Sequence, residues 1–250
     1  MNSQNWLRSH KKYDILREKG AVNRNGIQDI VFGGNFKMKI IKRNGSEAVF
    51  DITKIIAAIT KLRQAACNAK LIEPEVDVPS AKLETFVQLV QNLVAANHKA
   101  LVFSQFVEML HVIRDELQKR KIPFCYLDGS SKDRMESVQR FNTDESVPVF
   151  LISLKAGGTG LNLTGADEVI HVDPWWNPAV EEQATDRAHR IGQKNTVHSV
   201  RLITSDTIEE RVLQMQRRKR AIINSTVETG DEQTLSKLTW ADVQKLLDIE

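Results

Sequence analysis

The sequence is poor in cysteine and has no long apolar run, and each absence excludes a class of protein. Its 250 residues include only two cysteines, Cys67 and Cys125, which are far apart and in no metal-ligand spacing. Neither a zinc site nor a disulfide framework is therefore indicated. No apolar run approaches the length of a membrane span, and no signal peptide precedes the first polar residues. We therefore expect a cytoplasmic protein with no membrane partner.

A Walker A loop is also missing. The pattern G-x-x-x-x-G-K-[ST] occurs nowhere in the chain, so the backbone cradle for nucleotide phosphates and the hydroxyl that ligates Mg²⁺ are absent. Asp167 and Glu168 do not supply a Walker B acid, because such an acid follows its apolar strand and these two precede one. The six histidines form no cluster. The sequence thus predicts no metal ligand in this chain and no complete nucleotide site.

A large excess of charge of either sign is lacking as well. The chain has 35 Lys and Arg against 32 Asp and Glu, a formal net charge of +3. That charge is too small to indicate a nucleic-acid partner by itself. With 41% hydrophobic and 27% charged residues, the composition is that of an ordinary globular protein. Any nucleic-acid function must therefore rest on the local placement of particular residues.

From Ser80 onward, short apolar runs alternate with helical stripes. This alternation predicts an α/β fold in which a parallel sheet has helices on both faces. The expected strands are residues 99–103, 124–127, 149–153, 168–173 and 197–203, and the expected helices are 81–96, 106–117, 132–141 and 178–189. The carboxyl ends of such strands meet at one edge of the sheet, where ligands usually bind.

Both ends of the chain predict smaller additions to this sheet. Two prolines and three acids make residues 73–79 a linker. Before the linker, the sequence predicts helices at 12–19 and 53–67 on either side of a hairpin that turns at Asn44-Gly45. After the last strand, Asp206 with Glu209 predicts a helix N-cap and capping box, and a short helix is expected at 240–247.

Several motifs carry candidate chemistry. QATDRAHRIGQ, residues 183–193, holds Arg187 and Arg190 three positions apart, which predicts that both lie on one face of a helix. Arginine is suited to bidentate contact with phosphate oxygens. The glycine-rich SLKAGGTGLNL, residues 153–163, follows an apolar strand and can bring backbone N–H groups close to an anion. The remaining motifs are VFSQF at 102–106, YLDGSS at 126–131 and DPWWNP at 173–178.

In this order and spacing, the motifs resemble those of the C-terminal, second RecA-like lobe of Swi/Snf-family ATP-dependent DNA translocases, within helicase superfamily two. The resemblance covers roughly residues 60–250, and ATDRAHRIGQ with WNP upstream is its most specific part. It implies three regions. Residues 1–78 would form a helical and hairpin extension with the linker, residues 79–204 the RecA-like lobe, and residues 205–250 a brace helix and tail.

The resemblance also implies roles for single residues. Arg190 matches the arginine finger that reaches the γ-phosphate of ATP held by the other lobe, and Arg187 matches its helper. Gln183, Gly158 and Gly160 match positions at the nucleotide cleft. The residues that match DNA-contacting positions of the family are Ser104, Gln105, Gly129, Ser130, Lys155 and Trp176.

The function implied by the resemblance is that of a second motor lobe in a DNA-dependent ATPase. Its cofactor would be ATP with Mg²⁺, bound mainly by a first RecA-like lobe supplied in cis or in trans. Its other partner would be double-stranded DNA, at the nucleoid if the protein is bacterial. Because no Walker A loop is present, this chain alone is predicted to be inactive. The alternative is a truncated, non-enzymatic fragment that binds DNA.

Three features of the sequence can each be interpreted in two ways. Trp175 is expected to pack in the protein, whereas Trp176 either packs or faces DNA. The basic run at 217–220 fits a helix C-terminus, where cations interact favourably with the dipole, and fits a DNA contact equally well. Residues 40–60 resemble the start of the ATP-cone of ribonucleotide reductases, and the other interpretation of this segment is a structural excursion or a scar of gene fusion. A regulatory nucleotide-binding module over residues 37–66 is therefore a third candidate function.

Overall fold

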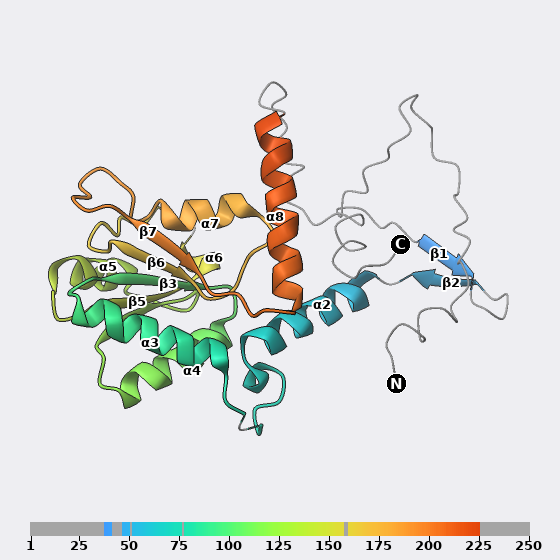
Figure 1. The fold of residues 1–250 in the computed structure, drawn as a ribbon, viewed down its shortest axis with the longest axis horizontal. Helices are drawn as coiled ribbons and strands as arrows, with labels where there is room; N and C mark the ends of the chain where they lie inside the picture. Colours follow the sequence, from blue (N-terminus) through green and yellow to red (C-terminus); the bar gives the residue numbers. More distant parts are fainter. Residues whose placement is uncertain (1–37, 42–46, 51, 77, 158–159, 226–250) are drawn as a thin grey trace. The chain divides into compact units, whose positions relative to one another are not determined.

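The computed structural model describes residues 38–41, 47–50, 52–76, 78–157 and 160–225 (Figure 1). The chain divides into two compact units, Met1–Ile59 and Thr60–Glu250, which are described separately. The expected helices at 12–19 and 240–247, the turn at Asn44-Gly45, and Gly158 lie outside the described residues. The region boundaries expected at 78/79 and 204/205 stay predictions.

The first unit contains the predicted hairpin strands. β1 (Met38–Ile41) pairs antiparallel with β2 (Glu47–Phe50), with Met38 opposite Phe50 and Ile41 opposite Glu47. Helix α2 (Ile52–Cys67) follows, as predicted, and its residues from Thr60 onward belong to the second unit. The hairpin and the helix were both indicated by local patterns, a strong turn signal and a helical stripe.

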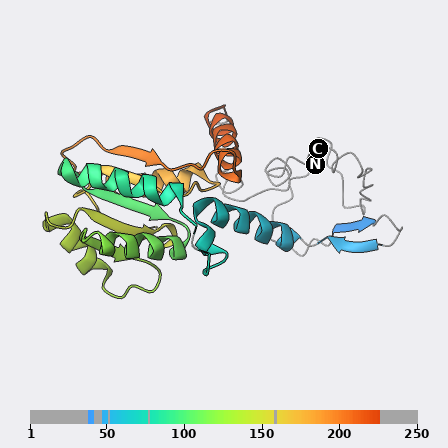
Figure 2. The ribbon, with the colours of Figure 1, turned by 60° about the horizontal axis from the view of Figure 1, so that its bottom comes forward.

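The second unit is built on a five-stranded parallel sheet in the order β4-β5-β3-β6-β7. The arrows of this sheet point the same way (Figure 2). All five strands coincide with predicted runs, which confirms the α/β fold. Their bounds are β3 (Ala100–Ser104), β4 (Phe124–Leu127), β5 (Val149–Ser153), β6 (Glu168–His171) and β7 (His198–Arg201).

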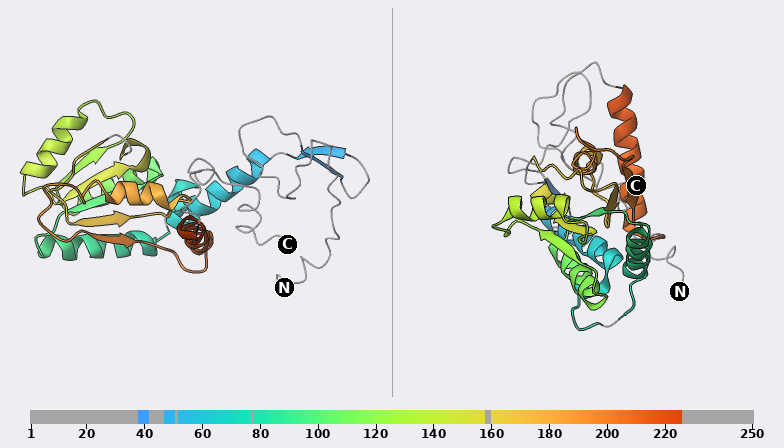
Figure 3. Two further views of the ribbon diagram at one scale, coloured as in Figure 1. Left: turned by 90° about the horizontal axis from the view of Figure 1, so that it is seen from above. Right: turned by 90° about the vertical axis from the view of Figure 1, so that its left-hand side faces the viewer.

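Helices cover both faces of the sheet because strand side chains alternate between the faces. On one face, α3 (Ala81–Ala95) and α4 (Val107–Lys119) pack over strand residues such as Val102. On the other face, α5 (Arg134–Thr143) and α7 (Pro178–Thr185) pack over residues such as Phe103. Figure 3 shows α3 and α5 on opposite sides of the strands. The central strand β3 is consequently buried along its whole length.

Two helix ends differ from the prediction. α7 ends at Thr185 and not near residue 189. The Asp206–Glu209 capping box does not form: Asp206 has φ +58°, and the hydroxyl of Thr207 accepts the hydrogen bond from the N–H of Glu209 at 3.2 Å. The Glu209 side chain turns into the protein, where it meets a buried lysine.

Helix α8 (Ile208–Ser225) contains the basic run at 217–220, with further helical residues after it. The run therefore does not end the helix, and the interpretation based on the dipole at a helix C-terminus is wrong. Two short helices, η1 (Ala69–Leu71) and α6 (Leu154–Gly157), complete the described elements. Within the described ranges, no helix has the length and apolar character needed to span a bilayer.

Candidate functional site

Four of the five sequence motifs lie at the carboxyl edge of the sheet, and the arginine motif at 183–193 lies toward the amino end of β6, where Gln193 bonds to Thr164 and Ala166. β3, β4, β5 and β6 run parallel, so the segments that follow them leave the sheet on the same side. These segments contain Gln105, the 128–131 turn, α6 and the 172–176 loop. This edge is where ligands bind in open parallel sheets.

The glycine-rich loop and the arginine segment are joined by hydrogen bonds. The N–H of Leu163 donates to the carbonyl of Arg187 at 2.9 Å. The side-chain amide of Gln193 donates to three carbonyls, those of Ala166 at 2.7 Å, Ala188 at 3.2 Å and Thr164 at 3.3 Å. Gln193 thus fixes the end of the arginine segment to the turn that follows the glycine loop.

Arg187 and Arg190 do not share a helix face, so this prediction is wrong. Beyond Thr185 the backbone continues in tight turns, and the Arg187 carbonyl is taken by Leu163. Arg187 is only 4% exposed, whereas Arg190 is exposed and donates from Nη1 to the Gly160 carbonyl at 3.3 Å. The two charges are nevertheless close. Burial lowers the pKa of Arg187, and the positive charge of Arg190 lowers it further.

The Nε of Arg187 is buried without a hydrogen-bond partner in the described part of the chain. A buried polar group without a partner is costly, because it loses hydration that nothing replaces. Beside it, Asn162, His189, Arg190 and Ile191 line an open hollow, and the Ile191 side chain is fully exposed. This part of the surface is therefore cationic, partly apolar and suited to an anionic ligand.

Of the other predicted nucleotide and loop residues, Gly160 lies beside Arg190, whose Nη1 donates to its carbonyl. Gln183 is exposed on α7, and Lys155 is exposed on α6. Gly160 is exposed and has φ +47°, a conformation that favours glycine. In DPWWNP, Asn177 caps α7 by accepting from the N–H of Ala179 at 3.1 Å. That part of the motif thus has a local structural role in starting the helix.

Ser104 is placed differently from the expected DNA contact. It is 0% exposed, and its hydroxyl donates to Oδ1 of Asp173 at 2.5 Å. The N–H of Gln105 also donates to the Asp173 carboxylate, at 3.3 Å to each oxygen. The Ser104 hydroxyl is therefore unavailable to DNA in this structure, and its role is to join the ends of β3 and β6. Gln105 is half-buried.

Gly129 and Ser130 form an exposed turn after β4. Asp128 holds the turn by accepting from the Ser130 hydroxyl at 2.6 Å and from its N–H at 2.8 Å. These bonds to Ser130 lower the pKa of Asp128 to about 2. A Cβ added at Gly129 would meet nothing within 4 Å. The turn thus offers small groups and open space, which suits the close approach of a phosphate.

The tryptophans have different environments. Trp175 packs against the core on the α5–α7 face, which confirms its predicted packing role. Trp176 is half-buried, and its ring centroid lies 3.9 Å from Cζ of Arg63. Arg63 comes from α2 and was missed by the sequence analysis. The available signal was its position four residues from both Ile59 and Cys67, an arginine on the buried stripe of a helix.

Glu181 was missed as well. It is 0% exposed and accepts from the N–H of Trp175 at 2.7 Å, from Nε of Arg201 at 2.7 Å and from the Gln216 amide at 2.8 Å. One carboxylate thereby joins the tryptophan loop, β7 and α8 to α7. A glutamate within a helix gives no local sign of such contacts.

His171 links β6 to α7. Its Nε2 lies 3.1 Å from the hydroxyl of Thr185, which itself donates to the carbonyl of Glu181 at 3.1 Å. His171 therefore donates from Nε2 and is neutral. Its ring stacks on Phe103, with centroids 5.8 Å apart. Burial lowers the pKa of His171 to about 4.

Acidification should destabilise the protein through His171. The unfolded chain binds the proton more readily, because the folded pKa is depressed from 6.5 to about 4. The contribution of His171 to the free energy of unfolding is therefore fully present above about pH 6.5. It falls as the pH is lowered toward about 4, by up to about 1.4 kcal/mol per pH unit. Urea unfolding at about pH 7.5 and about pH 5 should show about 2 kcal/mol more loss in the wild type than in His171→Gln. Equal pH dependence in both proteins would contradict this expectation.

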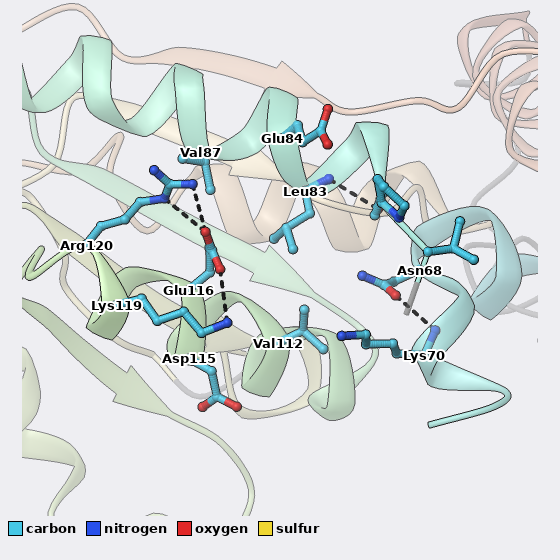
Figure 4. A pocket seen from close by; sticks show the side chains of 13 residues that line it. Asn68, Lys70, Leu83, Glu84, Val87, Val112, Asp115, Glu116, Lys119 and Arg120 are labelled. Carbon is cyan, nitrogen blue, oxygen red and sulfur yellow. Dashed lines mark hydrogen bonds and ion pairs between the residues drawn. The ribbon is translucent and has the colours of Figure 1, made fainter. Parts of the chain in front are cut away.

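A second hollow, of about 440 Å³, lies between α3 and α4, away from the carboxyl-edge loops (Figure 4). Leu83, Val87 and Val112 line it together with charged residues. Glu116 in its wall is already paired with Arg120 at 2.8 Å and Lys119 at 3.6 Å. None of the predicted site residues lines this hollow, so we assign it no role in the chemistry of the site.

Comparison with known proteins agrees with the fold. The family model "Helicase conserved C-terminal domain" matches residues 81–192. The chain is 39% identical over 210 residues to an ATP-dependent helicase of Mycoplasma pneumoniae, covering 83% of this chain and 20% of that protein. It is 36% identical over 220 residues to Helicase SWR1 of Saccharomyces cerevisiae, covering 86% of this chain and 14% of that protein.

The crystal structure of the C-terminal part of the Fun30 ATPase domain superposes with a TM-score of 0.54 at 35% identity, covering 63% of this chain and 54% of that one. The fold and motifs thus define a helicase conserved C-terminal domain with a RecA-like sheet. Within that class, the chain belongs to the Swi2/Snf2 family as the C-terminal lobe. It spans about a fifth of the length of the Mycoplasma pneumoniae relative.

Proposed function

We propose that this chain is the second motor lobe of a Swi/Snf-type DNA-dependent ATPase. In this role it supplies Arg187 and Arg190 to ATP bound mainly on a first RecA-like lobe, and it contacts the backbone of duplex DNA. The observation that carries the proposal is the pair of close arginines in the segment that Gln193 holds against the turn after the glycine-rich loop. Arg187 is buried, with an Nε that has no hydrogen-bond partner in the described structure, and Arg190 is exposed.

The arginine pair suits phosphoryl transfer. Negative charge on the γ-phosphoryl oxygens must be stabilised in the transition state, and a fixed guanidinium does this without reorganisation. Gln193 and Leu163 hold the segment in place through hydrogen bonds at 2.7–3.3 Å. Arg190 would reach the γ-phosphoryl group, and Arg187 would supply a second positive charge nearby.

The surroundings of the pair support contact with another lobe. Ile191 is fully exposed beside Arg190 and lines the same hollow, so the hollow is open to a partner. Gly160 is exposed beside Arg190, Gln183 is exposed on α7, and both would face the nucleotide. ATP and Mg²⁺ would be held mainly by the first lobe, because this chain has no Walker A loop.

Contact with duplex DNA would come from exposed or half-buried groups along the carboxyl edge. These are Gln105, the turn of Gly129 and Ser130, Lys155 and Trp176. Ser104 would act by joining β3 and β6, since its hydroxyl is occupied by Asp173. Contacts of this kind go to phosphate and sugar, so they position DNA without specifying its sequence.

The third candidate function, a nucleotide module at residues 37–66, is not proposed. Arg63, near the end of that segment, is buried against Gln105 and Trp176 of the helicase domain. Cys67 just beyond it is buried as well. The end of α2 therefore serves the lobe that follows it.

The chain alone should show no ATPase activity, with or without DNA. The reason is the missing Walker A loop, which leaves the phosphates and Mg²⁺ without their main ligands. Phosphate release from the purified chain is the measurement. Turnover above background that is stimulated by DNA would show that a nucleotide site has been overlooked.

The chain should bind duplex DNA weakly and without sequence preference, with an affinity that falls as salt rises because counterions are released. Gly129→Glu should weaken this binding by about tenfold, since the new carboxylate projects into open space beside the phosphate path. The matched control is Gln118→Glu, which adds the same charge on the exposed side of α4. Fluorescence anisotropy with labelled duplexes measures both. Salt-independent binding, or equal affinity of the two variants, would argue against the assigned surface.

A further inference from the structure

We infer that Arg63 is a positioning residue that orders the DNA-facing edge of the lobe by holding Gln105 and Trp176 in place. The inference rests on the proposed DNA contact at that edge. Arg63 lies outside the segment 81–192 that matches the helicase domain. The proposed edge is therefore incomplete without the second half of α2.

The geometry links one buried side chain to two loops. Arg63 is 1% exposed. Its Nη1 donates to Oε1 of Gln105 at 2.9 Å, and its Nη2 donates to the carbonyl of Pro174. Its Cζ lies 3.9 Å from the ring centroid of Trp176. The guanidinium thus contacts the loop after β3 and the loop after β6 at the same time.

These contacts are closer than the pairing of Arg63 with an acid. The distance from Nη2 to Oδ2 of Asp173 is 3.9 Å, and that carboxylate already accepts from the Ser104 hydroxyl at 2.5 Å. A simple buried ion pair would bring the charges closer. The near contacts of Arg63 are instead an amide oxygen, a carbonyl and an aromatic face, and two of them belong to residues proposed to meet DNA.

Only arginine fits this set of partners. Its planar guanidinium donates from separate nitrogens and stacks on an aromatic ring at once. A lysine ammonium is a point charge on a flexible stem, so it would keep a positive charge near Asp173 without fixing both loops. Arg63→Lys therefore separates the positioning role from the electrostatic need of the buried carboxylate.

The consequence for DNA is an ordered edge. With Oε1 of Gln105 held, the amide has one orientation, and with the guanidinium against one face, the Trp176 ring has one position. Ordering these side chains before binding removes part of the entropy loss on association. Loss of Arg63 should thus weaken DNA binding through Gln105 and Trp176, and should leave the arginine pair at 187 and 190 in place.

A double-mutant cycle on the full chain tests this inference. Affinity for a short labelled duplex of mixed sequence is measured for wild type, Arg63→Lys, Trp176→Leu and the double variant. Each single change should weaken binding by about tenfold, and the loss in the double variant should be clearly smaller than the product of the two single losses. Independent effects that multiply in the double variant, or normal affinity of Arg63→Lys, would overturn the inference.

Two measurements keep the outcome unambiguous. Urea unfolding establishes that each variant is folded under the binding conditions. If Arg63→Lys is unfolded, Arg63→Gln is tested in an Asp173→Asn background, and its affinity is compared with that of Asp173→Asn alone, with the same expected result. Failure of the wild type to bind duplex DNA would instead refute the proposed function itself.

Discussion

Replacing Arg190 with alanine in a complete two-lobe motor should lower ATP turnover by about 10³-fold or more. Charge accumulates on the γ-phosphoryl oxygens in the transition state, and a fixed guanidinium stabilises it there more than in the ground state. Arg190→Lys should not restore turnover, because an ammonium lacks the planar fork and the reach of a guanidinium.

The fold should tolerate this change. Arg190 is exposed, and its side chain makes one long hydrogen bond, at 3.3 Å, to the Gly160 carbonyl. The free energy of unfolding should therefore change by no more than about 0.5 kcal/mol. Affinity for duplex DNA should also stay near that of the wild type, because the proposed DNA contacts lie on other loops.

A chimera supplies the missing lobe for this experiment. This chain would replace the matching segment of the Mycoplasma pneumoniae relative, and steady-state ATPase kinetics would be measured beside thermal unfolding. Arg114→Ala is the matched control, since Arg114 is another exposed arginine, paired with Asp115 on α4. If Arg190→Ala turned over like Arg114→Ala, or if it unfolded the lobe, Arg190 would have no catalytic role. Loss of turnover without loss of the fold would also separate the motor-lobe function from that of a purely DNA-binding fragment.

The sheet could be predicted because covered parallel strands are apolar along their length. Residues 100–104 are buried at every position, and this strand appeared in the sequence as a short apolar run. The convergence of four of the motifs was predictable for a related reason. Carboxyl ends of parallel strands share one edge, so segments following different strands must meet there.

The roles of individual side chains could not be predicted, because they depend on contacts between distant parts of the chain. Ser104 bonds to Asp173, 69 residues away, and Arg63 bonds to Gln105 and Pro174, 42 and 111 residues away. Local patterns carry no information on such pairs. A serine in a family motif was therefore predicted to face the ligand, although its hydroxyl joins two strands.

The arginine segment could not be predicted from its local pattern either, because a contact with a distant residue decides its structure. The helical pattern predicted α7 to continue to residue 189, which would align Arg187 with Arg190 on one face. The carbonyl of Arg187 instead accepts from Leu163, 24 positions earlier in the chain, and tight turns replace the helix. Consequently one arginine is buried and the other exposed. The two are expected to differ in their effect on stability when they are replaced.

Lys82→Met should lower the free energy of unfolding by about 3–5 kcal/mol, because it leaves a buried carboxylate without its partner. Nζ of Lys82 lies 2.6 Å from both oxygens of Glu209, and the two side chains are 3% and 0% exposed. The same ammonium donates to the carbonyls of Val172 at 3.0 Å and Leu202 at 3.1 Å. The pair thus ties the start of α3 and the ends of β6 and β7 to the first turn of α8.

The loss of unfolding free energy in Lys82→Met should be large because the pair is buried. An exposed ion pair of similar geometry tests this expectation. Arg120 and Glu116 approach to 2.8 Å on the surface of α4, so Arg120→Ala should cost no more than about 1 kcal/mol. The double variant Lys82→Met with Glu209→Leu should recover most of the stability lost in Lys82→Met, since no buried charge is left unpaired. Urea unfolding of the four proteins measures these differences. If Lys82→Met lost no more stability than Arg120→Ala, the buried pair would not be what holds α8 to the sheet.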